Sequence, residues 1–179
     1  VLIFASMYYI DAPRQKLLDS LKNNNRTLIF LSGTGRLGGA EKGSGFKVVA
    51  TNRTPKHQIY TLPGVDYLLI SAYANLKDPH PEVKPDWYDY MKKVYTIPRK
   101  GDKVLARFEF NNEAAIVERE NMNWKSVYIG EPGSLSPDYF NHLVREAGAY
   151  AVSTSGFQCV TDGNFMMLHS MVNGKRELR

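Results

Sequence analysis

The last third of the chain, Trp124–Arg179, has the sequence WKSVYIGEPGSLSPDYFNHLVREAGAYAVSTSGFQCVTDGNFMMLHSMVNGKRELR. It predicts a strand, a capped helix, a second strand, a hairpin and a final strand after a turn at Asn173-Gly174, because each boundary has a local signal. Ser136 offers the side-chain oxygen of a helix N-cap, Pro137 suits the first helical position, and Gly148 can end the helix. One face of this helix has the apolar spacing of a buried face: Phe140, Leu143, Val144 and Ala147.

Turn residues predict antiparallel hairpins near the C-terminus. Phe157–Thr161 and Asn164–Met171 are joined by Asp162-Gly163, a dipeptide typical of tight turns. A second hairpin is predicted over 103–118, where two adjacent asparagines supply the turn. Asparagine suits that position because it tolerates the positive φ that tight turns need.

The opening segment predicts a βαβ unit. Val1–Ile10 has the composition of a buried strand, Asp11 offers a helix N-cap, and Pro13 lies in the first helical turn. Thr27–Ser32 is the next apolar strand. Such units normally build parallel sheets with right-handed crossovers, so we expect an α/β fold with a mostly parallel sheet.

Composition bounds the class of protein. A chain of 179 residues that is 43% hydrophobic and 23% charged fits one domain with a substantial core, residues 1–179. No apolar run is long enough for a transmembrane helix, so we expect no membrane partner. The net charge of +5 is scattered along the chain, which does not favour nucleic-acid binding. A single cysteine, Cys159, excludes an internal disulfide.

A glycine-rich segment, Gly33–Gly45, follows the second predicted strand. Gly33, Gly35 and Gly38 match the spacing of a dinucleotide-binding loop. The segment lacks the Gly-Lys-Ser/Thr order of a P-loop, and no helix is signalled after it, although phosphate binding needs amides at a helix N-terminus. A flexible surface loop is the favoured interpretation, with a small-molecule or nucleotide site as the alternative.

We find no catalytic constellation in the sequence. A glycosidase needs two carboxylates roughly 5–10 Å apart, and Asn112-Glu113 resembles the acid of many glycosidases only superficially, since a hairpin turn explains it. The other carboxylates considered occupy turns or a helix start: Glu131, Asp138 and Asp162. The histidines show no metal-ligand spacing: His57, His80, His142 and His169. We therefore assign no catalytic, cofactor or metal residue, and expect no cofactor.

The segment Pro85–Tyr95 is rich in aromatic residues. Tryptophan and tyrosine dominate the cores of protein interfaces, so the segment is a candidate subunit contact. A loop packed on its own domain explains it equally well, and a sugar-stacking surface is a third interpretation. The candidate interface residues are Trp87, Tyr88, Tyr90 and Tyr95.

Two segments resemble the middle domain of glycoside hydrolase family 42 β-galactosidases. Residues 1–35 resemble its strand, its helix bearing Gln and Arg, and its next strand ending in glycine. The last third is similar to the end of that domain. The residues that carry this second resemblance are Trp124, Ser126, Val127, Tyr128, Ala147, Gly148, Asn164, Phe165, His169, Gly174 and Lys175.

The resemblance implies a flavodoxin-like three-layer sandwich related to class I glutamine amidotransferases, without their catalytic cysteine. It implies a non-catalytic role, usually trimerisation beside a catalytic TIM barrel that holds the family's glutamates. The expected partners are that barrel and identical subunits. The chain begins inside an apolar run and ends just after an Asn-Gly turn, so we expect it to be a piece of a larger multidomain protein.

Overall fold

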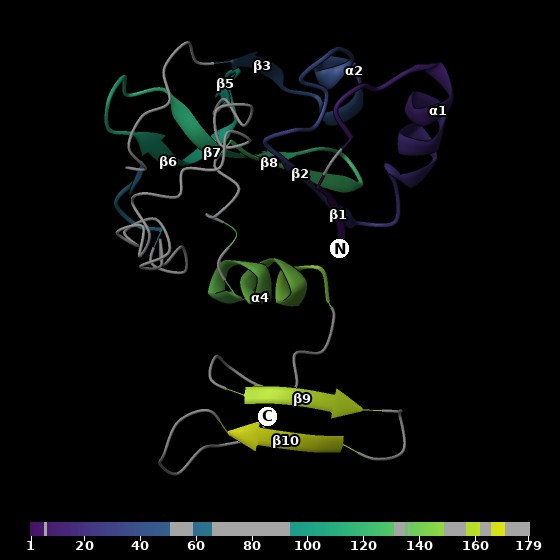
Figure 1. The fold of residues 1–179 in the computed structure, drawn as a ribbon, viewed down its shortest axis with the longest axis vertical. Helices are drawn as coiled ribbons and strands as arrows, with labels where there is room; N and C mark the ends of the chain where they lie inside the picture. Colours follow the sequence, from purple (N-terminus) through teal and green to yellow (C-terminus); the bar gives the residue numbers. More distant parts are fainter. Residues whose placement is uncertain are drawn as a thin grey trace, which may run out of the picture.

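The computed structural model describes residues 1–5, 7–50, 59–65, 94–130, 135, 137–148, 157–161 and 166–170. Its main feature is a curved mixed sheet, with helices α1 and α2 above it and α4 below it (Figure 1). The strands of this sheet are β1 (Leu2–Phe4), β2 (Arg26–Leu31), β3 (Lys47–Ala50), β4 (Ile59–Thr61), β5 (Val94–Ile97), β6 (Lys103–Phe108), β7 (Ala114–Glu120) and β8 (Trp124–Ile129). The helices are α1 (Ala12–Leu21), α2 (Ala40–Ser44) and α4 (Pro137–Glu146).

The opening βαβ unit is confirmed. Strands β1 and β2 pair in parallel through the crossover helix α1, and β2 pairs in parallel with β8. The Asp11 side chain accepts a hydrogen bond from the Arg14 amide at 3.0 Å, so it caps α1 as predicted. Asn24 and Asn25, both at positive φ, lie between the end of α1 and β2.

Strand β1 is much shorter than the ten residues predicted. After Phe4 the chain leaves the sheet, because its carbonyls bond to the glycine-rich segment instead of to β2. Gly35 donates to the Met7 carbonyl at 2.7 Å and Leu37 to the Tyr8 carbonyl at 2.8 Å. Residues of the expected strand therefore wrap the loop that follows β2.

The second half of the sheet is antiparallel. Strand β7 pairs with β8 and with β6, β6 pairs with β4, and β5 joins β7 to β3. The predicted hairpin over 103–118 is confirmed as β6 and β7, and Asn112 has a φ of 59° beside the turn. Two register shifts interrupt this hairpin, between Val104 and Ala106 and between Ala106 and Arg107. Such bulges increase local twist and bend a strand.

The prediction of a flavodoxin-like three-layer sandwich is wrong. Among the described strands, only β1, β2 and β8 pair in parallel, and the mixed sheet curls into a half-barrel with few helices. A doubly wound fold needs a helical crossover for each added parallel strand. Between β2 and β8 this chain adds strands that pair antiparallel, which need only short turns. Strands β6, β7 and β8 follow one another by short turns, and the bulges between β6 and β7 bend this part of the sheet.

The two faces of the sheet bury separate apolar clusters. On the upper face, Leu28, Phe30 and Tyr128 pack with Leu18 of α1 and with Phe46 just after α2. The lower face packs against α4, and its fully buried members include Ile29, Val127, Ile129, Tyr139 and Leu143. Alternating residues of β2 and β8 thus serve opposite faces, as strand geometry requires.

Helix α4 is confirmed, but its buried face is rotated from the prediction. Tyr139 and Leu143 are fully buried, whereas Phe140 and Val144 are only partly covered. The Tyr139 hydroxyl donates to the buried Glu118 of β7 at 2.8 Å, a polar contact that an apolar spacing rule misses. Gly148, at a φ of 75°, follows the helix and stops it as predicted. Ser136, the predicted N-cap, lies outside the described residues.

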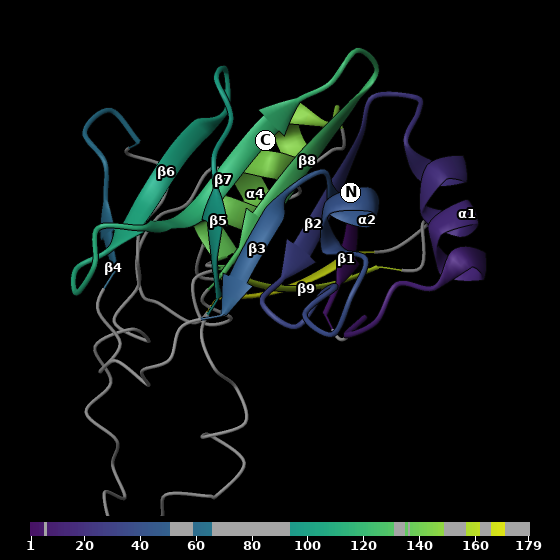
Figure 2. The same cartoon turned by 90° about the horizontal axis from the view of Figure 1, so that it is seen from above.

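The C-terminal hairpin is also confirmed. Strands β9 (Phe157–Thr161) and β10 (Met166–Ser170) pair antiparallel, with Met166 opposite Thr161. The hairpin lies on the far side of α4 from the main sheet (Figure 1). Seen from above, α4 runs beneath β7 and β8, and α1 lies beside the β1–β2 end of the sheet (Figure 2).

Candidate functional site

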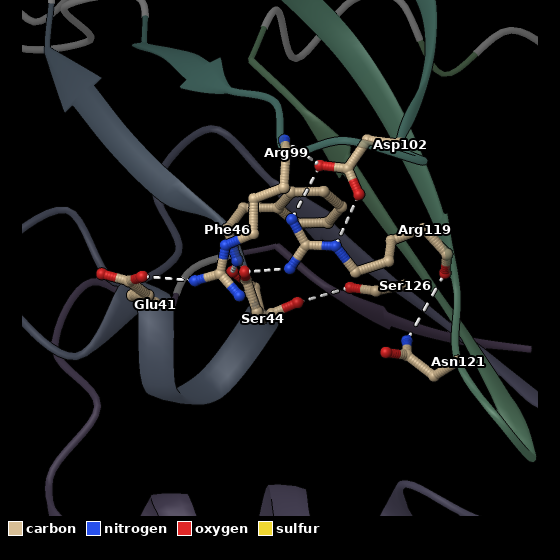
Figure 3. Close-up of polar contacts among 9 residues, drawn as sticks. Glu41, Ser44, Phe46, Arg99, Asp102, Arg119, Asn121 and Ser126 are labelled. Atoms are coloured by element: carbon tan, nitrogen blue, oxygen red, sulfur yellow. Dashed lines mark hydrogen bonds and ion pairs between the residues drawn. The ribbon is translucent and has the colours of Figure 1, made fainter.

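A cluster around Arg119 joins three segments that are distant in sequence (Figure 3). Arg119, near the end of β7, donates from Nε to Asp102 Oδ1 at 2.6 Å and from Nη2 to Asp102 Oδ2 at 2.7 Å. Its third nitrogen, Nη1, donates to the carbonyl of Gly45. The guanidinium carbon lies 4.5 Å from the centroid of the Phe46 ring, a cation–π contact.

The carboxylate of Asp102 is held ionised. Burial by itself raises the pKa of Asp102, but hydrogen bonds from Arg119 and from the Arg99 amide outweigh it and hold the pKa below its ordinary value. The side chain of Asp102 is only 3% exposed and that of Arg119 only 14%. A carboxylate with a lowered pKa and occupied oxygens is unsuited to donating a proton. The Arg119 cluster therefore acts as a structural clamp.

Two serines extend the Arg119 cluster toward α2. The Ser126 hydroxyl donates to the Ser44 carbonyl at 2.6 Å, and the Ser44 hydroxyl donates to the Ala40 carbonyl at 2.7 Å. Both serines are fully buried. The first of these bonds fastens the short helix α2 to strand β8, whereas the second lies within α2. The bond from Arg119 to the Gly45 carbonyl holds the end of α2 as well.

A second polar cluster lines an open groove of about 410 Å³ at the amino end of β2 and β8. Its centre is Lys125, whose Nζ contacts Glu120 at 2.8 Å and Glu146 of α4 at 2.6 Å. Burial lowers the pKa of Lys125, but its two carboxylate partners outweigh burial and raise that pKa above its ordinary value. The remaining lining residues are Asn25, Thr27, Asn121, Met122 and Trp124.

The carboxylates of this groove do not form a glycosidase pair. A glycosidase acid needs a raised pKa so that it is protonated at working pH. Burial raises the pKa of Glu146, but the Lys125 ammonium outweighs it and the pKa lies below its ordinary value. The Lys125 ammonium thus favours the ionised form of Glu146, which suits a structural tie between β8 and α4.

The glycine-rich segment Gly33–Gly45 was interpreted either as a flexible surface loop or as a small-molecule or nucleotide site, and its structure differs from both. It is a packed turn, because Gly33, Thr34 and Gly35 are buried, and Tyr128 donates its hydroxyl to the Thr34 carbonyl at 3.0 Å. A Cβ on Gly35, whose φ is 70°, would lie 2.3 Å from the Ala40 Cα. The expected flexible surface loop is therefore wrong, and the five-residue helix α2 follows where none was signalled.

The amides of this turn are already committed to carbonyls. Those of Thr34, Gly35, Arg36, Leu37 and Gly38 all donate to main-chain oxygens, at 2.7–3.3 Å. A phosphate cradle needs such amides to point at the ligand. These hydrogen bonds speak against a nucleotide site in the Gly33–Gly45 segment.

Of the four predicted interface residues, the structure describes one. Tyr95, on β5, is partly buried and packs against the α4-side core cluster. Trp87, Tyr88 and Tyr90 lie outside the described residues. The aromatic segment as a whole therefore stays an untested candidate interface.

The carboxylates and histidines that were considered in the sequence form no catalytic arrangement among the described residues. The Glu113 amide donates to the Asn111 side chain at 3.1 Å, as the turn interpretation predicts. His142 lies 3.3 Å from Glu146, one turn along α4. Within the described ranges, no cluster of three His, Cys, Asp or Glu side chains could hold a metal ion. His57, His80, Glu131 and Asp162 lie outside those ranges, and so does the side chain of His169.

Sequence reasoning missed an uncovered apolar surface at strand β1. Among the strands that the structure describes, β1 is the outer one on this side of the sheet, and its Leu2 and Ile3 are exposed. Tyr8, Tyr9 and Leu37, which follow the carboxyl ends of β1 and β2, are also exposed. We call Leu2, Ile3, Tyr8, Tyr9 and Leu37 the β1 surface. The apolar run was predicted to be buried, and only the strand order reveals that it lies at an edge.

The chain matches no protein-family model and no curated protein sequence. In the described part of the chain, no helix is long and apolar enough to cross a membrane.

Proposed function

We propose that the chain is a non-catalytic assembly module of a carbohydrate-active enzyme, a glycoside hydrolase of β-galactosidase type. Its role is to join identical subunits and to accompany a catalytic TIM barrel in the same polypeptide. Two arguments support this. The sequence resemblance of residues 1–35 and Trp124–Arg179 supports the parent enzyme class, and the β1 surface supports assembly.

The observation that carries the assembly role is the exposure of the β1 surface. Five exposed apolar side chains gather along β1 and in the loops that follow β1 and β2, and groups of exposed apolar residues are typical of sites of association. Aromatic side chains such as Tyr8 and Tyr9 are enriched in interface cores. The charged clusters of the described residues face inward or pair with each other, so they offer less to a partner than this uncharged surface.

Light scattering on the chain tests the assembly role. We expect the measured mass to rise above that of one chain as concentration increases from about 1 µM to about 100 µM, a range that detects micromolar affinity. A mass equal to one chain at every concentration would contradict the proposal.

Hydrolysis assays test the non-catalytic role separately. We expect nitrophenyl galactosides to be turned over by the full-length parent polypeptide and not by residues 1–179. Turnover by this chain that Glu113→Gln abolishes would assign catalysis to it and overturn the non-catalytic role. The parent's complete sequence is the matched control, since the proposal requires a TIM barrel with two carboxylates elsewhere in it.

A further inference from the structure

We propose that the groove at the amino end of β2 and β8 binds neutral hexose sugars. The proposal goes beyond the assembly role and does not depend on it, because the residues that line the groove and those of the β1 surface do not overlap. The groove volume of about 410 Å³ lies within the range of small-molecule sites, roughly 300–1,000 Å³.

A row of polar side chains on three neighbouring strands lines the groove. Thr27 of β2 lies opposite Lys125 of β8, and Lys125 lies opposite Glu120 of β7. Residues that lie opposite each other in a sheet point to the same face. That face is the one beneath which α4 runs, since Lys125 also contacts Glu146 of this helix at 2.6 Å. The groove is therefore built on the sheet and closed on one side by α4.

The hydroxyl of Thr27 is the observation that points to a ligand. Thr27 is only 3% exposed, and it is one of the residues that line the groove. Within the described residues its hydroxyl has no hydrogen-bond partner, although buried hydroxyl groups are normally hydrogen-bonded. An unpaired buried hydroxyl destabilises the fold, so a ligand that pairs with this group gains a favourable contact.

Other lining residues add unused hydrogen-bonding groups. Asn25 is exposed, and in the described part of the chain its side chain also has no partner. Asn121 donates from Nδ2 to the Arg119 carbonyl at 3.4 Å, which leaves its Oδ1 to accept. Glu120 contacts Lys125 through Oε1, and its side chain is 72% exposed, so its second oxygen can accept. Donors and acceptors thus alternate along the groove.

This mixture favours a neutral ligand that carries several hydroxyl groups. Each hydroxyl both donates and accepts, so it matches a surface where donors lie next to acceptors. The carboxylates of Glu120 and Glu146 disfavour an anion, and the ammonium of Lys125 disfavours a cation. Met122 and Trp124 add apolar lining for the C–H groups of a ring. A neutral sugar meets all of these requirements.

An NMR titration of the ¹⁵N-labelled chain tests the proposal, with galactose and glucose as the probes. We expect saturable shifts of the Thr27 and Lys125 amides at millimolar sugar, and no shift at Asn112 in the turn between β6 and β7. Galacturonate and glucuronate are the matched ligand controls, because each adds a carboxylate to the same ring. We expect them to bind at least about tenfold more weakly than the neutral sugars.

Two variants of neighbouring asparagines locate the site. Asn25→Gly removes a side chain that lines the groove, and Asn24→Gly removes an exposed one that does not. Asn24 and Asn25 have φ values of 55° and 54°, which glycine adopts without strain, so both variants should fold. We expect Asn25→Gly to weaken sugar binding about fivefold and Asn24→Gly to leave it unchanged.

Thr27→Val tests the buried hydroxyl. Valine keeps the shape of the side chain and removes only the group that has no partner in the described residues. We expect sugar binding at least about fivefold weaker, while the thermal stability of the sugar-free chain stays equal or rises. A hydroxyl with a purely structural role would instead lower that stability and leave binding unchanged.

Three results would overturn the proposal. The first is the absence of saturable shifts with either sugar at about 100 mM. The second is binding that shifts amides away from the groove or that Asn25→Gly and Thr27→Val both leave unchanged. The third is equally tight binding of the uronic acids. None of these results bears on the assembly role, which light scattering measures separately.

Discussion

Two arginine–carboxylate pairs lie side by side in Figure 3, yet they occupy different environments. Arg119 and Asp102 are 14% and 3% exposed, whereas Arg99 and Glu41 are 58% and 55% exposed. The chemical groups are the same in both pairs. From this comparison we expect burial, rather than the presence of an ion pair, to decide how much each pair contributes to stability.

The buried pair is also the better connected one. Asp102 accepts from both Arg119 and the Arg99 amide, and Arg119 additionally bonds the Gly45 carbonyl and stacks on Phe46. Removing one partner of a buried pair leaves an uncompensated charge, which costs far more than the pair contributes in water. The exposed pair rehydrates when it is broken, and water screens it.

Asp102→Ala should show the largest effect, a loss of about 3–5 kcal/mol in the free energy of unfolding. The Arg119 guanidinium would stay buried without a counter-charge. Urea denaturation followed by circular dichroism measures the loss. The double variant Asp102→Ala/Arg119→Met is the control, and we expect it to recover part of the stability because it removes the stranded charge. A loss below about 1 kcal/mol would show that the pair behaves like a surface pair.

The Arg119–Asp102 pair should also make the free energy of unfolding depend on pH in the acidic range. Asp102 has a folded-state pKa below its ordinary value of 3.8. Its contribution is therefore complete above about pH 5 and is lost as pH falls through the unfolded and then the folded pKa. Unfolding measured from about pH 6 to about pH 2 should show a steeper loss for the wild-type chain than for Asp102→Asn. Equal slopes would mean that other carboxylates carry the acid sensitivity.

Lys125→Met should have an intermediate effect, a loss of about 1 kcal/mol. The lysine itself is largely buried, but its partners Glu120 and Glu146 are exposed and can rehydrate. Methionine keeps most of the volume of the side chain, so the loss reports mainly on charge. Thermal unfolding at low and high salt checks this, because salt should reduce the difference between the two proteins. A difference that salt leaves unchanged would point to packing instead.

Glu41→Gln should have the smallest effect, within about 0.5 kcal/mol of the wild-type chain. The Glu41 carboxylate and Arg99 are both exposed. The variant therefore loses a solvated ion pair, and water hydrates the Arg99 guanidinium in its place. The same denaturation assay serves as the measurement. A loss of stability comparable with that of Asp102→Ala would contradict the expectation that the exposed pair contributes less to stability than the buried pair.

Local elements followed from local signals in the sequence. The cap at Asp11, the start of α4 at Pro137 and its stop at Gly148 were predictable because each depends on residues within one or two helical turns. The hairpins were predictable because their turns are formed by adjacent residues. The buried face of α4 was predicted less well, since Tyr139 is buried through its bond to Glu118, a residue 21 positions away.

The Arg119 cluster could not be predicted from local signals in the sequence. Asp102 and Arg119 are separated by 17 residues, and Gly45 is 74 residues from Arg119, so no spacing rule connects them. The three meet only because β6, β7 and the end of α2 converge in the folded sheet. In the glycine-rich segment a spacing signal is present but misleading. The glycines match the spacing of a dinucleotide-binding loop, yet the amides of the turn donate to carbonyls of the chain itself.

The sequence by itself determined α1, α4 and the hairpins, because caps, turn residues and apolar periodicity act over a few residues. It did not determine the short helix α2 or the early end of β1. Tertiary structure decided which strands pair across long stretches of the chain, such as β2 with β8. Strand pairing depends on contacts between distant segments, and that choice made the sheet a half-barrel instead of a three-layer sandwich. It also decided that Leu2 and Ile3 lie at an open edge, although their apolar side chains look the same in sequence as those of a buried strand.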